Sequence, residues 1–177
     1  RDSVASRGRG DVYKRQIHVN ATNVVEFIAP QGGNSTHDVL QRNINAVYEQ
    51  RDKTGQAMIA HVNHPNFGWG IVAEDLINLQ GDPFFEVYNG HPMVNNWGDD
   101  AHPSTDRMWD IVLAMRLNQG LNPIFCLAMD DAHGYYKNKI GESYPGRGWV
   151  MVKAQTLNTE NIITSLEKGN FYSTTGV

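Results

Sequence analysis

The residues best suited to chemistry in this 177-residue chain form a short Asp-x-His motif, Asp131-Ala132-His133. The motif follows an apolar segment of strand length, and the end of a strand directs the carboxylate and the imidazole to the same side. An oxygen ligand and a nitrogen ligand together suit zinc, manganese or iron. The alternative is a turn capped by Asp131 with His133 on the surface, and a motif this short leaves both interpretations open.

A second candidate is the segment His61-Val62-Asn63-His64-Pro65. The proline restricts the backbone and directs the imidazole of His64 away from the strand axis. The alternative is a packed loop in which His64 stacks on Phe67 or Trp69. His64 and the Asp-x-His motif support each other as ligands, because side chains from separate strands converge in metal-binding barrels.

The other histidines are more ambiguous. His18 lies in the first expected strand, where it is either a ligand or a core histidine. His91 and His102 precede prolines in a loop rich in Asn and Asp, and they either line a substrate entrance or are solvated. His37 falls in the first turn of an expected helix and should face solvent. Cys126, the only cysteine, lies in an apolar strand and is expected to be an inert thiol.

Composition excludes several classes of protein. Hydrophobic residues make up 40% of the chain and charged residues 19%, which is typical of a globular domain rather than a disordered, collagenous or coiled-coil chain. No apolar run approaches the roughly 20 residues that span a bilayer, so a membrane partner is not expected. The net charge of −4 argues against a nucleic-acid partner. There is no glycine-rich nucleotide loop and no G-x-S-x-G serine elbow.

Strand and helix patterns alternate along the chain. Strands are expected within 17–28, over 57–61, 84–88, 123–129 and 149–154, and from Phe171 onward. The expected helices are one capped by Thr36 that ends before Gly55, a short one over 74–79, one capped by Thr105 that stops at Gly120, and one capped by Asn158 or Thr159 that ends at Lys168-Gly169.

This alternation favours a parallel sheet with helical crossovers, as an open α/β sheet or an α/β barrel. In both folds the chemistry lies at the carboxyl ends of the strands. Three successive expected strands are followed by His64, by Asn89-Gly90-His91 and by Asp130-Asp131-Ala132-His133. The sequence therefore predicts a site at that edge of the sheet.

Residues 1–16 differ from the rest of the chain. They carry five basic and two acidic residues without helix or strand periodicity. They read either as a basic disordered arm or as a non-native segment, because Asp11–Gln16 (DVYKRQ) looks like the translation of a sequencing-library adapter. We take 1–16 as adapter-like and expect the natural chain to start near Ile17, with its true N-terminus missing. Cytoplasmic and secreted locations both stay open.

The order of several short motifs in residues 17–177 resembles the PHP metallohydrolases, the polymerase and histidinol phosphatase superfamily, and within it the carbaryl-hydrolase-like (CehA/McbA) branch. These motifs are NHP (63–65), EVYNG (86–90), WD (109–110), DDAH (130–133), GWVMVKA (148–154) and LEKGNFYSTTG (166–176).

The resemblance implies a distorted (β/α)7 barrel with two or three divalent metals, zinc, manganese or iron, at the ends of its strands. It implies hydrolysis of a small-molecule phosphoester, ester or carbamate by metal-activated water. His64 matches the ligand of the family's His-Pro motif, and Asp131 and His133 match its late Asp-x-His ligands. His18 matches the histidine after the family's bridging glutamate. In such a site we expect His91 to orient the substrate or to donate a proton to the leaving group.

The family's opening H-x-H strand and its bridging glutamate have no counterpart in the chain. We therefore expect residues 17–177 to be the C-terminal portion of the domain, truncated at the N-terminus and also at the C-terminus. Such a fragment should be inactive or nearly so by itself, with an uncovered sheet edge. The competing hypotheses are a non-catalytic ligand- or carbohydrate-binding α/β domain and a structural remnant without a site. The oligomeric state stays open.

Overall fold

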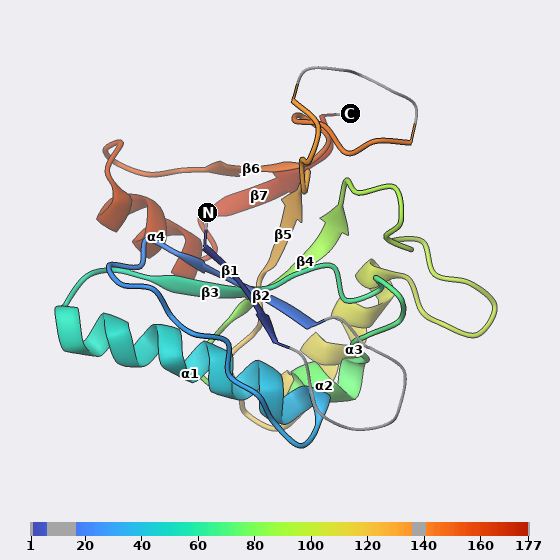
Figure 1. The fold of residues 1–177 in the computed structure, drawn as a ribbon, viewed down its shortest axis with the longest axis horizontal. Helices are drawn as coiled ribbons and strands as arrows, with labels where there is room; N and C mark the ends of the chain where they lie inside the picture. The colour runs from blue at the N-terminus through green and yellow to red at the C-terminus, as the bar shows by residue number, and fades with distance from the viewer. Residues whose placement is uncertain (1, 7–16, 136–140, 177) are drawn as a thin grey trace.

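The chain folds as a mixed α/β structure around a five-stranded sheet (Figure 1). The computed structural model describes residues 2–6, 17–135 and 141–176. The strands are β1 (Asp2–Ser6), β2 (Ile17–Thr22), β3 (Ile59–Val62), β4 (Phe84–Asn89) and β5 (Cys126–Met129), paired in that order. A separate antiparallel ribbon joins β6 (Trp149–Val152) to β7 (Phe171–Thr174). Within the described ranges the sheet ends at β1 and β5 without closing, so the expected barrel is not seen.

The expectation of a parallel sheet is correct for β3, β4 and β5 and wrong for the other two strands. β3, β4 and β5 are mutually parallel, whereas β2 runs antiparallel to β3 and β1 antiparallel to β2. The adapter-like segment contributes β1 through residues 2–6, and its residues 1 and 7–16 lie outside the described chain. Excluding residues 1–16 from the fold therefore omitted a strand of the sheet.

β2 is antiparallel to β3 because the chain crosses the sheet one additional time between β2 and α1. The segment 23–35 runs back along α1 (Thr36–Thr54) before that helix begins. The Gln50 side chain accepts hydrogen bonds from the backbone N–H groups of Val25 and Glu26, and the Asn43 side chain exchanges two with the backbone of Gln31. A strand, an extended segment and a helix thus cross the sheet before β3 starts, which leaves β2 and β3 in opposite directions.

The helices form close to where the sequence predicts them, with small corrections at their N-caps. α1 is capped by Ser35, one residue before the expected Thr36, because the Ser35 hydroxyl accepts from the Asp38 N–H at 3.1 Å. α3 (Thr105–Asn118) likewise begins one residue after its cap, Ser104, and the Thr105 hydroxyl donates instead to backbone carbonyls. The other helices are α2 (Ala73–Ile77) and α4 (Thr159–Glu167), the latter capped by Asn158.

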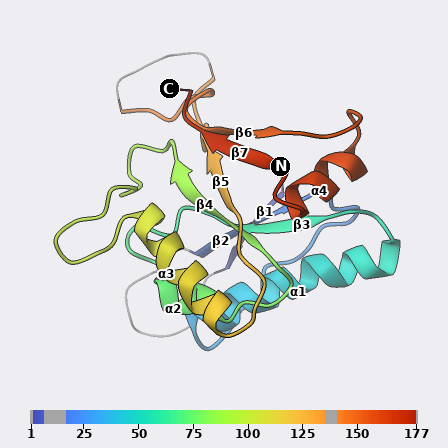
Figure 2. The same cartoon turned by 180° about the vertical axis from the view of Figure 1, so that it is seen from behind.

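The two faces of the sheet are covered differently (Figures 1 and 2). Helices α1, α2 and α3 pack on one face over the larger core, which takes Val19, Ala60, Val62 and Phe85 from the strands. The opposite face is covered in part by α4 and the β6–β7 ribbon. Because successive side chains alternate across a strand, the residues between these core positions point to the second face. None of the described helices is long and apolar enough to cross a membrane.

A buried arginine ties α2 to α3. The Arg116 side chain is almost fully buried, and its guanidinium donates to the carbonyl oxygens of Ile77, Leu79 and Asn122 at 2.6–2.9 Å. Burial lowers its pKa, and the nearby Asp82 carboxylate opposes that shift. The guanidinium satisfies carbonyls at the end of α2 that have no partner within such a short helix.

Replacing Arg116 with methionine should destabilise the fold strongly. The buried residues Ile77 and Leu79 and the exposed residue Asn122 would lose the donor to their carbonyls, and each loss at a buried carbonyl costs about 1–3 kcal/mol before the structure relaxes. We expect the free energy of unfolding in urea to fall by at least ~2 kcal/mol. The matched control is Arg107→Met on the exposed face of the same helix, where the change should stay within about 0.5 kcal/mol. Equal effects of the two variants would contradict this role for Arg116.

Candidate metal centre

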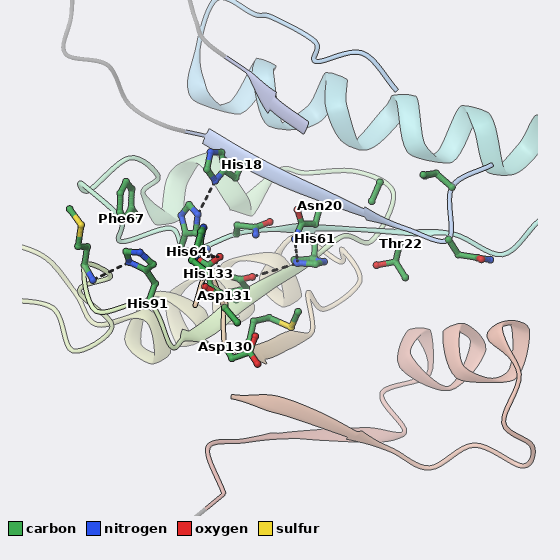
Figure 3. Close-up of a pocket in the computed structure, with 18 residues that line it drawn as sticks. His18, Asn20, Thr22, His61, His64, Phe67, His91, Asp130, Asp131 and His133 are labelled. Atoms are coloured by element: carbon green, nitrogen blue, oxygen red, sulfur yellow. Dashed lines mark hydrogen bonds and ion pairs between the residues drawn. The ribbon is translucent and has the colours of Figure 1, made fainter. Parts of the chain in front are cut away.

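A cavity of about 810 Å³ opens at the carboxyl ends of β3, β4 and β5 (Figure 3). All five residues that the sequence predicts for the site line this cavity: His18, His64, His91, Asp131 and His133. The last four follow the three parallel strands, as predicted. His18 reaches the same end because β2 is antiparallel, so the beginning of β2 lies beside the end of β3 and the Asn63 N–H donates to the His18 carbonyl at 3.1 Å.

His18 and His64 form the closest pair of candidate ligands. His18 Nδ1 lies 3.0 Å from His64 Nε2, and the rings meet edge to face. Two nitrogens bound to one tetrahedral zinc at ~2.0–2.1 Å would lie ~3.3 Å apart, so the spacing suits either a direct hydrogen bond or a shared ion. His64 Nδ1 is buried without a hydrogen-bond partner among the described residues. The ring of His64 also packs on Phe67, as the alternative interpretation expected.

The environment of His18 favours its neutral form. Burial lowers the pKa of His18, and the neighbouring His64 lowers it further, while the carboxylates of Asp131 and Glu86 oppose the shift. A neutral imidazole keeps a lone pair for a metal ion, which an imidazolium lacks.

Asp131 and His133 are oriented by their own loop. Asp131 has a positive φ of 48°, and the Ser143 hydroxyl donates to the backbone carbonyls of Asp130 and Asp131. The Asp131 Oδ2 atom lies 3.3 Å from the amide nitrogen of Asn89. His133 Nδ1 donates to the Asp131 carbonyl at 2.7 Å, which leaves Nε2 as the ring nitrogen with a lone pair. The imidazole of His133 is largely exposed.

His91 lies at the mouth of the cavity. Its Nδ1 accepts from the Met93 N–H at 3.2 Å, so the proton of the neutral ring is on Nε2. Its ring is in edge contact with those of Phe67 and His133. Burial lowers the pKa of His91, with Asp131 opposing the shift. A neutral ring with an Nε2–H group suits the orientation of a substrate oxygen better than the donation of a proton.

Sequence analysis missed two buried residues of the cavity as individual candidates, His61 and Glu86. Both are at least 95% buried, and His61 Nε2 lies 3.5 Å from Glu86 Oε1. The signal that could have identified them is the alternation of side chains between the two faces of a strand. His61 alternates with the core residues Ala60 and Val62, and Glu86 follows the core residue Phe85, so both point to the cavity face.

Other candidate residues lie away from the cavity. His102 stacks on Trp69 with its Nδ1 2.8 Å from Asp99. His37, expected to face solvent, donates from Nδ1 to the Asp75 carbonyl at 2.9 Å. Cys126 is half-buried on β5, and burial raises its thiol pKa to about 11, which keeps it protonated at neutral pH as an inert thiol should be.

The donor types of the cavity fit a divalent cation better than its present geometry does. Five histidines and three carboxylates line it, and its described lining includes no lysine or arginine. However, the described residues contain no group of three or more His, Cys, Asp or Glu side chains close enough to hold a metal ion. The cavity thus supplies the pairs His18–His64 and Asp131–His133 rather than one convergent cluster.

Comparison with protein-family models, with curated proteins and with solved structures gives no match for this chain.

The lowered pKa of His18 predicts how stability depends on pH. A histidine whose pKa is depressed by folding contributes stability above its unfolded value of about 6.5, and this stability is lost as the pH falls towards the folded value. We expect the free energy of unfolding to decline from pH 7.5 to 5.5, shallowly because the ring is only partly buried. His18→Gln should flatten that slope. Equal slopes for the wild type and the variant, measured in urea at each pH, would contradict the assignment.

Proposed function

We propose that this chain is the metal-binding part of a metal-dependent hydrolase that acts on a small-molecule phosphoester or a related ester or carbamate. The observation that carries the proposal is the composition of one cavity. Five of the seven histidines and three carboxylates line it, delivered by adjacent strands and by the loops that follow them. Buried imidazoles beside carboxylates are the donors that zinc, manganese and iron prefer.

The charge of the cavity supports a cation as its first ligand. Glu86, Asp130 and Asp131 are not offset by a lysine or arginine among the described lining residues. An anionic substrate such as a phosphoester would be repelled unless positive charge were bound first. A site that uses metal charge to attract and hold its substrate meets this requirement, whereas a metal-free anion-binding pocket does not.

Bound divalent metals would supply a hydroxide at neutral pH by lowering the pKa of water towards ~7. Within the chain, His18 and His64 would hold one ion, with Asp131 and His133 as further ligands. His91 would orient the substrate through its Nε2–H group. Phe67 and Met93 give the mouth of the cavity an apolar wall.

The topology is compatible with part of a PHP-type barrel. Strands β3, β4 and β5 are parallel, and helices α1–α3 cover the face opposite to the cavity. In an α/β barrel the helices are likewise outside and the polar strand ends surround the site. The proposal therefore includes that residues 17–177 form the C-terminal portion of such a barrel.

The test is metal content, measured by plasma mass spectrometry after equilibration with Zn²⁺ or Mn²⁺ and removal of free ion. We expect the wild-type chain to retain metal and His64→Ala to lose most of it, because the variant removes a buried ligand. His102→Ala, which changes a histidine outside the cavity, should retain the wild-type amount. Phosphatase turnover with p-nitrophenyl phosphate should be low in this chain and should fall further in His64→Ala.

Two results would contradict the proposal. Absence of metal from the wild-type chain under metal-replete conditions would exclude a metal centre formed by these residues. Equal metal content in wild type and His64→Ala would reject His64 as a ligand. Small-molecule binding that persists in excess chelator would instead favour the non-catalytic ligand-binding domain.

A further inference from the structure

Glu86 is a buried carboxylate at the centre of the candidate site. It lies on β4 with 1% of its surface exposed, and the described chain offers it no lysine or arginine partner. A buried charge is costly unless hydrogen-bond donors compensate for the lost water. Two donors do so here, both directed at Oε2: the backbone N–H of His64 at 2.7 Å and the side-chain amide of Asn89 at 2.7 Å.

Each of these donors belongs to, or leads to, a candidate ligand. The first is the N–H of His64 itself. The second, the Asn89 amide nitrogen, also lies 3.3 Å from Asp131 Oδ2, so one amide group bridges two carboxylates. The Asn89 Oδ1 atom accepts from the His91 N–H at 2.8 Å. Asn89 is held in turn by Asn96, whose side chain bonds both its N–H and its carbonyl.

The two ligands that this network reaches have unusual backbone conformations. His64 has a φ of 23° and Asp131 a φ of 48°, in the left-handed region that residues other than glycine avoid. Such conformations persist where the surroundings hold them, and they concentrate at functional sites. The charge-assisted bond from the His64 N–H to Glu86 fixes the first of them directly.

We propose that Glu86 is the positioning residue of this cavity, which sets His64 directly and Asp131 through Asn89. That the positioned side chains hold a metal ion rests on the proposed function. Glu86 acts through other residues because Oε2 already accepts two hydrogen bonds and Oε1 faces His61. The ligand residues of two separate loops thereby depend on one carboxylate.

The test compares three variants of the full chain. Glu86→Leu removes the acceptor and keeps approximate size. Glu86→Gln keeps one acceptor oxygen that can serve the His64 N–H and the Asn89 amide. Asn43→Leu is the matched control, because Asn43 is an equally buried residue with three side-chain hydrogen bonds to the backbone, far from the cavity on α1.

The first readout uses metal-free protein and follows amide hydrogen exchange of His64 by NMR. Loss of its acceptor in Glu86→Leu should speed exchange at His64 by more than the change in global stability accounts for. Glu86→Gln should restore slow exchange. In Asn43→Leu the His64 amide should change only in proportion to global stability. If exchange at His64 follows global stability in Glu86→Leu as well, the positioning role is rejected.

The second readout is titration with Co²⁺, whose visible absorption reports coordination geometry. Loss of a residue that orients ligands typically weakens metal binding about 10–100-fold, and we expect this for Glu86→Leu together with an altered spectrum. Asn43→Leu should bind as the wild type does, and Glu86→Gln should be closer to wild type than Glu86→Leu. Wild-type affinity and spectrum in Glu86→Leu would overturn the inference. A wild-type chain that binds no Co²⁺ would instead refute the proposed function, and the exchange data alone would then decide whether Glu86 fixes His64.

Discussion

The arrangement of the cavity depends on the requirement that the buried carboxylate of Glu86 be satisfied without a cationic side chain. Its donors must come from the chain nearby, and the loops after β3 and β4 provide them. To present its N–H to Oε2, the loop after β3 has to turn sharply at His64, just before Pro65. The positive φ of His64 is therefore best understood as the consequence of a buried charge that requires a hydrogen bond.

The same sheet serves stability on one face and chemistry on the other. Along β2, Ile17 and Val19 enter the large core under α1, whereas His18 and Asn20 line the cavity. Each apolar residue buried on the helical face thus fixes the direction of a polar neighbour on the other face. A shift of register by one residue would bury the histidine in the core and expose the valine, so the core itself specifies where the candidate ligands point.

Much of this could be predicted from the sequence, because apolar runs, cap residues and turn residues are local signals. The helices, and the polar groups after β3, β4 and β5, follow from such signals. The direction of β2 could not be predicted, since it depends on hydrogen bonds from segment 23–35 to Asn43 and Gln50, twelve or more residues away. The roles of His61 and Glu86 were missed because histidine and glutamate inside short strands look like surface residues until the faces of the sheet are assigned.

The cavity consists of two donor pairs joined by a relay of hydrogen bonds. His18 and His64 meet directly, Asp131 and His133 share a loop, and Asn89 connects the loop to Glu86. In the first pair one nitrogen must carry the proton that the other accepts, so a cation that takes both nitrogens has to displace that proton. Burial lowers the pKa of His18 and so keeps its ring neutral, with a lone pair on one nitrogen for the cation. The negative charge of Glu86 and Asp131 attracts a cation to the cavity, and it also opposes the lowering of the His18 pKa.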